Sequence, residues 1–130
     1  MWDLVGQGPP QPGSARSLLP ILRGQASDLG REMIIAEFWR QWDFYPQAMV
    51  HDGKRKYVFN FGGTDKYYEL AKDPFELHNR IDAPAAAEIV QRMRAYLHDW
   101  LERVHSPMKE GFERTLAAKT GWVEGIRQRP

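Results

Sequence analysis

The most regular pattern in the chain is an alternation of residues that predicts a β-hairpin. Tyr57, Phe59 and Phe61 occupy every second position, and Asp52-Gly53 separates this run from an apolar run that begins near residue 47. Asp-Gly is a preferred pair for a type I′ turn, because both central residues of that turn have positive φ. We therefore expect strands at about 47–51 and 55–61, joined at Asp52-Gly53.

Two further segments have the character of strands. Residues 31–38 centre on the apolar run Met-Ile-Ile-Ala, which is typical of a strand buried in a sheet, although periodicity alone does not distinguish it from a helix. Residues 66–70, Lys-Tyr-Tyr-Glu-Leu, follow a Gly-Gly turn and place Tyr68 and Leu70 on one face. Together with the hairpin, they predict a small antiparallel sheet.

A long amphipathic helix is predicted from about Pro84 to His105. Asp82 could cap it, and Ser106-Pro107 would end it. Apolar residues recur there at spacings of three and four, forming a stripe that would cover the sheet: Ile89, Met93, Tyr96, Leu97, Trp100, Leu101 and Val104. The predicted fold class is therefore α+β, a small antiparallel sheet of three to four strands with one long helix packed across it.

The two ends of the chain carry weaker signals. Residues 6–13 hold three glycines and three prolines and predict a linker, followed by a short helix that ends at Gly24. After residue 108 the apolar positions are interrupted by glycines, which favours a marginal helix and a tail. We expect three regions: a linker and short helix (1–24), an α+β subdomain (25–107) and a tail (108–130).

The segment from Asp73 to Asn79 predicts a single helical turn. Asp73 could cap it, Pro74 suits the first helical position, Glu76 lies three residues after the cap, and Asn79 could end the turn. The same oxygen-bearing residues could also bind calcium, but a calcium loop would place more oxygen ligands at closer spacing. Capping is the favoured interpretation, so these residues and Trp100 are assigned structural roles.

A second segment, between two predicted strands, combines aromatic and charged residues in a pattern typical of a loop that lines a ligand or faces a partner. The same aromatics could instead cover one end of the core, and the two interpretations are about equally favoured. The candidate residues of this aromatic loop are Glu37, Trp39, Arg40, Trp42, Phe44 and Tyr45.

Composition excludes several classes of function. Eighteen Lys and Arg against 17 Asp and Glu leave a net charge of +1, so bulk charge does not favour nucleic acid, and no stretch is long and apolar enough for a membrane span. The chain has no cysteine, so it has no thiolate metal site and no cysteine nucleophile. Its four histidines lack the spacing of a metal site, and no pair of carboxylates or nucleophile with its base is recognisable. We expect no catalytic residue and no metal ligand in this chain.

The order and spacing of several motifs over about residues 2–105 resemble the C-terminal region of sulfatases of the arylsulfatase and heparan N-sulfatase type. The motifs are residues 13–24, Ala36-Glu37, the segment Met49 to Val58 with its His-Asp-Gly-Lys, and Tyr68-Glu-Leu-Ala-Lys-Asp-Pro-Phe-Glu-Leu-His-Asn79. The resemblance implies a four-stranded sheet with one helix, docked on a large α/β domain of the alkaline-phosphatase-like type.

In that family the chemistry depends on a formylglycine made in a C/S-x-P-x-R motif, on calcium, and on lysine and histidine, all upstream of the matched region. This chain has neither a cysteine nor an S-x-P-x-R sequence, so no catalytic residue or cofactor carries over. The resemblance therefore implies a truncated or separately encoded, non-catalytic subdomain that completes a sulfatase-like sulfuric ester hydrolase.

An alternative function is a free-standing interaction module that binds a protein partner through its apolar face. In either case we expect a protein partner, either the large domain or another chain, and self-association through the exposed docking face is a further expectation. The N-terminus has no signal-peptide pattern, so the chain as written would be cytoplasmic, while the compartment of its parent is unknown.

Overall fold

The computed structural model describes residues 16–39 and 46–120. Contacts divide the chain into two units, Met1–Glu32 and Met33–Pro130. In the first unit, α1 (Leu19–Leu22) is a single helical turn that buries none of its residues. Ser17 Oγ accepts a hydrogen bond from the Leu19 amide, 3.2 Å away, and the left-handed Gly24 (φ +67°) follows the helix. This agrees with the short helix predicted before Gly24.

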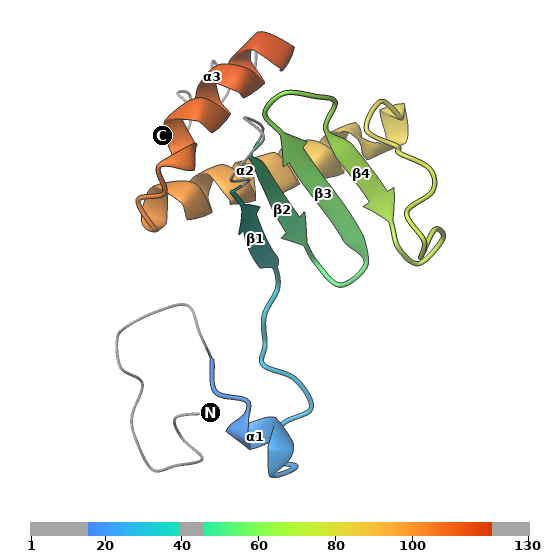
Figure 1. The fold of residues 1–130 in the computed structure, drawn as a ribbon. Helices are drawn as coiled ribbons and strands as arrows, with labels where there is room; N and C mark the ends of the chain where they lie inside the picture. The colour runs from blue at the N-terminus through green and yellow to red at the C-terminus, as the bar shows by residue number, and fades with distance from the viewer. Residues whose placement is uncertain (1–15, 40–45, 121–130) are drawn as a thin grey trace. The chain divides into compact units, whose positions relative to one another are not determined.

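The second unit contains a four-stranded antiparallel sheet in the order β1-β2-β3-β4 (Figure 1). The strands are β1 (Ile34–Phe38), β2 (Gln47–His51), β3 (Arg55–Asn60) and β4 (Lys66–Glu69). One row across the sheet joins Ala36, Met49, Val58 and Lys66. A short 3-10 helix, η2 (Pro84–Ala86), leads into α2 (Ala87–Arg103), and α3 (Met108–Thr120) follows. The predicted fold class is confirmed.

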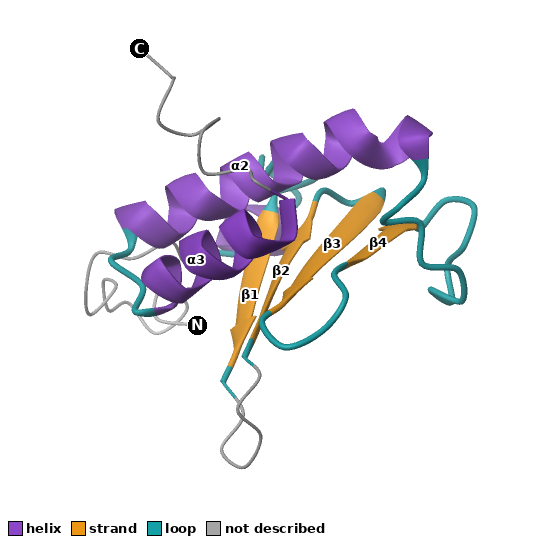
Figure 2. Ribbon diagram, turned by 90° about the horizontal axis from the view of Figure 1, so that it is seen from above, coloured by secondary structure: helices purple, strands orange, loops and turns teal. Residues whose placement is uncertain are grey.

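The core lies between one face of the sheet and the two long helices (Figure 2). Alternation along the strands directs every second residue to this face, and the stripe along α2 meets them. Val104, the last residue of the predicted stripe, is the exception, because it follows the end of α2 and is exposed. Ile89, Tyr96 and Trp100 are half-buried at the margin of the core, while Arg92, Asp99 and Arg103 are exposed. The members of this core cluster that belong to the sheet and α2 are Ala48, Val50, Tyr57, Phe59, Tyr67, Val90, Met93, Leu97 and Leu101.

The segment after residue 107 differs from the marginal helix and tail that its glycines suggest. Met108, Phe112 and Leu116 are spaced by four residues on one face of α3, and all three are buried in the same core. Gly111 serves packing, because a Cβ at this position would lie 2.7 Å from Cε1 of Phe61. At the start of the helix, Ser106 Oγ accepts a hydrogen bond from the Met108 amide, 3.2 Å away.

The hairpin between β2 and β3 is confirmed, but its turn is shifted by one residue from the prediction. The Asp52 amide donates to the Arg55 carbonyl oxygen over 3.1 Å, so these two residues close the turn and Gly53-Lys54 is its centre. Gly53 has φ of +87°, whereas Asp52 and Lys54 do not have positive φ. Glycine with positive φ at the first central position is the signature of a type II′ turn, so the type I′ assignment is wrong.

The predicted helical turn at Asp73-Pro74-Phe75-Glu76 is reduced to one hydrogen-bonded turn, in which the Glu76 amide donates to the Asp73 carbonyl oxygen over 3.1 Å, and no helix follows it. Glu76 has φ of +57°, a left-handed conformation that a right-handed helix does not contain. The Asp73 carboxylate accepts hydrogen bonds from the amides of Leu77 (3.0 Å) and His78 (2.8 Å), so it closes a loop instead of capping a helix. Asp82 does not cap the long helix either: η2 begins after Ala83, without a side-chain cap.

Candidate docking surface

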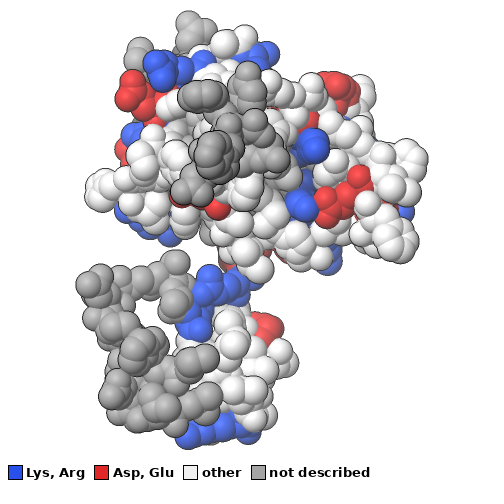
Figure 3. Space-filling model, in the orientation of Figure 1, with Lys and Arg blue, Asp and Glu red and all other residues white. Residues whose placement is uncertain are grey.

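One face of the sheet carries apolar side chains on the side opposite the helices. Alternation places Ile34, Ala36 and Phe38 of β1 on this face, next to Met49 of β2 and Val58 of β3. We call these five residues the open sheet face. Ile34 and Phe38 are 51% and 53% exposed, so β1 is an edge strand with one exposed face, and the prediction of a buried strand from its apolar run is wrong. Figure 3 views the sheet from this side, and charged groups of both signs are scattered there among uncharged surface.

The beginning of the aromatic loop is tied to the helical layer. Ser106 Oγ donates to Glu37 Oε1 over 2.6 Å, and Trp39 Nε1 donates to Glu37 Oε2 over 3.3 Å. Glu37 therefore connects the end of β1 to the start of α3 and orients the indole of Trp39, which is about half exposed. The other candidates of this loop lie outside the described residues: Arg40, Trp42, Phe44 and Tyr45.

A second apolar element is the loop from Asp73 to Asn79, whose conformation is held by polar contacts. Lys56 Nζ donates to both carboxylate oxygens of Glu76, at 2.9 and 2.8 Å. Asn79 Oδ1 accepts from the amides of Tyr67 (2.9 Å) and Ile81 (3.1 Å). Between these anchors, Phe75 and Leu77 are 81% and 74% exposed. The loop thus presents two large apolar side chains to the surroundings.

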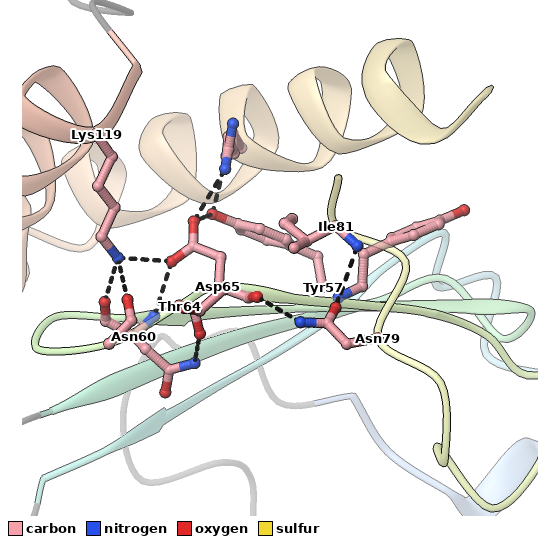
Figure 4. A network of polar contacts seen from close by, with 10 residues as sticks. Tyr57, Asn60, Thr64, Asp65, Asn79, Ile81 and Lys119 are labelled. Carbon is pink, nitrogen blue, oxygen red and sulfur yellow. Dashed lines mark hydrogen bonds and ion pairs between the residues drawn. The ribbon is translucent and has the colours of Figure 1, made fainter. Parts of the chain in front are cut away.

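Sequence reasoning missed a network of polar groups centred on Asp65, which is only 3% exposed (Figure 4). Its Oδ2 accepts hydrogen bonds from the Tyr57 hydroxyl (2.7 Å) and from Arg94 Nη2 (3.0 Å). Its Oδ1 accepts from Lys119 Nζ at 2.9 Å and from the Asn60 amide at 3.2 Å. The network joins β3, the β3–β4 loop, α2 and α3 around one carboxylate.

The role of this network is structural, because its donors are engaged within the fold. Lys119 Nζ also donates to the carbonyl oxygens of Asn60 (2.5 Å) and Gly63 (2.7 Å), so all three of its hydrogens are engaged. Burial and the adjacent Asp65 carboxylate raise the pKa of the Tyr57 hydroxyl, which therefore remains a donor. Arg94 and Lys119 follow Asp65 by 29 and 54 residues, so no local motif in the sequence could have indicated the cluster.

A buried histidine also connects the helices: His98 Nε2 lies 2.7 Å from Oε1 of Glu113, so α2 is joined to α3 by this contact. Among residues 16–39 and 46–120, no group of three or more histidine, aspartate or glutamate side chains could hold a metal ion. No helix in the described part of the chain is long and apolar enough to cross a membrane.

Sequence comparisons give two curated relatives. An uncharacterized protein of Haemophilus influenzae is 26% identical over 116 residues, which are 89% of this chain and 59% of that protein. The uncharacterized sulfatase YidJ of Escherichia coli is 29% identical over 80 residues, which are 58% of this chain and 16% of that protein. No protein-family model matches the chain. The chain thus spans less than two thirds of either relative.

Comparison with solved structures also finds sulfatases. A sulfatase from Bacteroides thetaiotaomicron superposes with a TM-score of 0.75 at 27% identity, and a 2-O GAG sulfatase superposes with a TM-score of 0.74 at 27% identity. Each match covers 84% of this chain and 24% of the sulfatase. This chain is therefore similar, in sequence and in fold, to the C-terminal subdomain of the sulfatase family, at about a quarter of the length of these solved members.

Proposed function

We propose that this chain is a non-catalytic C-terminal subdomain of a sulfatase-like sulfuric ester hydrolase, and that it docks on the large catalytic domain and completes it. The observation that carries the proposal is the open sheet face. A small sheet normally buries the apolar residues of both faces or exposes polar residues on one of them. Here the second face presents Ile34 and Phe38 to the surroundings, which favours a partner that covers it.

The size of the matching sulfatases supports the identity of that partner. This chain corresponds to 24% of each of the two solved sulfatases, so about three quarters of such a protein lies outside the matched region. A large domain of this kind would offer enough surface to cover the open sheet face. The exposed Phe75 and Leu77 provide a second apolar contact for the same partner.

The aromatic loop would lie at the boundary with the large domain. Glu37 fixes the direction in which this loop leaves β1 through its contacts with Ser106 and Trp39. Arg40 is the residue that we assign to contact with an anionic group, because its planar guanidinium can bind a carboxylate or sulfate with two parallel hydrogen bonds. Its role is a prediction from the sequence.

The sequence motifs and the described residues of this chain do not fit the cofactors of the family. The formylglycine requires a cysteine or serine in its motif, and the chain has no cysteine and no S-x-P-x-R sequence. Calcium needs several oxygen ligands together, and no group of three carboxylate or histidine side chains in the described residues could supply them. We therefore assign no step of sulfate hydrolysis to this chain.

Binding to a large domain tests the proposal. The 2-O GAG sulfatase, expressed without the region that this chain matches, is titrated with the purified 130-residue chain in a calorimeter. We expect saturable binding by the natural chain. Phe38→Glu should weaken binding at least tenfold, because it would bury an unpaired carboxylate at the interface. Trp39→Ala, Arg40→Ala and Trp42→Ala test the aromatic loop in the same assay.

The matched control is Arg103→Ala, which changes an exposed side chain on the outer side of α2. It should bind as the natural chain does. Absence of binding by the natural chain would contradict docking. If Phe38→Glu binds as tightly as Arg103→Ala, the open sheet face is not the contact. If the three loop variants also bind as tightly as Arg103→Ala, the aromatic loop has only a packing role.

A further inference from the structure

The two edges of the sheet differ in how their backbone groups are satisfied. At the outer edge of β4, the Tyr67 amide donates to Asn79 Oδ1 over 2.9 Å, and the Arg80 amide donates to the Tyr67 carbonyl oxygen over 2.9 Å. At the outer edge of β1, no hydrogen bond from the described residues reaches the backbone. An edge strand with unpaired N–H and C=O groups is a template for pairing with another strand.

The register identifies the backbone groups of β1 that point outward. The hydrogen bond between Asp52 and Arg55 makes these two residues a hydrogen-bonded pair of the hairpin. Hydrogen-bonded and non-hydrogen-bonded pairs alternate along antiparallel strands. Because of this alternation, Gln47, Met49 and His51 of β2 direct their backbone groups away from β3 and toward β1. Their register partners are Phe38, Ala36 and Ile34, respectively.

It follows that Ile35 and Glu37 direct their N–H and C=O groups away from the sheet. The same alternation can be checked on β4, where it directs the backbone of Tyr67 outward. Tyr67 is indeed the residue that bonds with Asn79 and Arg80. The outer edge of β1 therefore offers four backbone hydrogen-bonding groups, two from each of two residues.

We propose that this edge pairs with β1 of a second copy of this chain, antiparallel about a two-fold axis at Ala36. Ile35 would then oppose Glu37 of the second copy, and Glu37 would oppose its Ile35, so that all four groups bond. In the non-hydrogen-bonded positions, where side chains are closest, Ile34 would face Phe38 of the second copy and Ala36 would face its equivalent. The two sheets would become one sheet of eight strands.

The side chains favour a second copy because the edge is complementary to itself. Ile34 and Phe38 lie two residues on either side of Ala36, so the two-fold axis pairs a β-branched residue with an aromatic one twice. Ala36 at the axis is small enough for the strands to approach. Glu37 would face the uncharged Ile35 of the second copy, so the pairing places no two like charges opposite each other. Its carboxylate is already bound by Ser106 and Trp39 on the helical side.

This inference does not rest on the proposed function, since it concerns the edge of β1 and is measured on the chain alone. Sedimentation velocity of the purified chain, up to about 1 mM because small interfaces bind weakly, should show a monomer–dimer equilibrium. Ile34→Lys with Phe38→Lys should abolish the dimer, because lysines would face each other twice. Ile34→Lys with Phe38→Glu should retain it, because each lysine would face a glutamate.

The comparison of these double variants reports on pairing between copies. Positions 34 and 38 are about 13 Å apart along the strand, too far for an ion pair within one chain. Both variants change only exposed side chains, and equal melting temperatures would show that the fold is retained. A dimer that persists in the Lys–Lys variant, or is lost equally in both variants, would overturn the proposed register. A natural chain that is monomeric throughout would overturn the pairing itself.

A single cysteine gives an independent measurement in this cysteine-free chain. Ala36→Cys should form a disulfide-linked dimer readily under mild oxidation, because the two Cβ atoms would lie within the reach of a disulfide at the axis. Arg103→Cys, exposed on α2, is the control and should crosslink much more slowly. Equal rates for the two variants would contradict an axis at Ala36.

Discussion

Gly53 occupies a backbone conformation that few other residues tolerate, with φ of +87°. A Cβ at this position would have no neighbour within 4 Å, so a substitution is opposed by backbone strain and not by a clash. We expect Gly53→Val to lower the free energy of unfolding by about 1 kcal/mol or more, because β-branched residues are poorly tolerated at positive φ. Chemical denaturation measures the change.

Gly63→Val is the matched control for this prediction. Gly63 also has open space around its Cα but does not have positive φ. The loss at Gly63 should be clearly smaller than that at Gly53. Equal losses would mean that the turn does not depend on the left-handed conformation of Gly53.

Asp73 should make the 73–79 loop sensitive to acid. Hydrogen bonds from the amides of His78 and Leu77 hold the pKa of the Asp73 carboxyl below its ordinary value of 3.8. A group whose pKa is lower in the folded state stabilises the fold above its unfolded pKa, and this contribution is lost as the pH falls through the folded pKa. The loop should therefore keep its hydrogen bonds at pH 3.8 and lose them only below it.

An NMR titration of the Leu77 and His78 amide shifts measures this transition. The two amides should titrate together, with a midpoint below pH 3.8. In the Asp73→Asn variant the transition should disappear, since the side chain no longer ionises. A midpoint at or above the ordinary value of aspartate would contradict the role of these hydrogen bonds.

At the scale of elements, α2 is attached to the sheet by its buried apolar stripe. Leu97 lies in the middle of that stripe and is fully buried. Leu97→Ala should cost about 2–5 kcal/mol of unfolding free energy through lost burial and the cavity that remains. Arg103→Ala, on the exposed side of the same helix, should change it by less than about 0.5 kcal/mol. A comparably small change at Leu97 would show that the stripe is not part of the core.

The Asp65 network attaches α3 to the rest of the unit. Asp65→Ala would leave Arg94 and Lys119 without their carboxylate, and removing one partner of a buried ion pair costs about 3–5 kcal/mol. The partial exposure of Lys119 places the expected loss at the lower end of this range. Hydrogen exchange should in addition become faster in α3, which distinguishes a loosened helix from uniform destabilisation.

Glu88→Ala is a control for the Asp65 variant, because Glu88 is an exposed carboxylate on α2. It should leave both the unfolding free energy and the exchange rates of α3 nearly unchanged. If Asp65→Ala behaves in the same way, the network contributes little to the position of α3.

For the whole molecule, the purified chain should not release sulfate from an aryl sulfate. The resembled family depends on a formylglycine and on calcium. The sequence has no formylglycine motif, and residues 16–39 and 46–120 hold no group of three carboxylate or histidine side chains that could bind calcium. A full-length solved sulfatase serves as the positive control in the same calcium-containing buffer. Calcium-dependent turnover by the 130-residue chain above a buffer blank would disprove this prediction.

Part of this organisation could be derived from local patterns. The strands of the hairpin, the long helix and the antiparallel sheet follow from the spacing of apolar residues, because side chains alternate along a strand and recur every three to four residues on a helix. The beginning of the aromatic loop, at Glu37 and Trp39, was also recognisable from composition. Its assigned role in docking stays a prediction, as do the roles of Arg40, Trp42, Phe44 and Tyr45.

The sequence by itself therefore determined the elements whose signal is periodic and local, and the absence of a cysteine nucleophile. Only the tertiary structure decided that α3 completes the core, that Gly111 makes room for Phe61, and that Asp65 gathers Arg94 and Lys119. It also decided the shift of the turn to Gly53-Lys54. The physical reason is that these features depend on contacts between segments far apart in the chain, or on closing hydrogen bonds, whose partners no local pattern specifies.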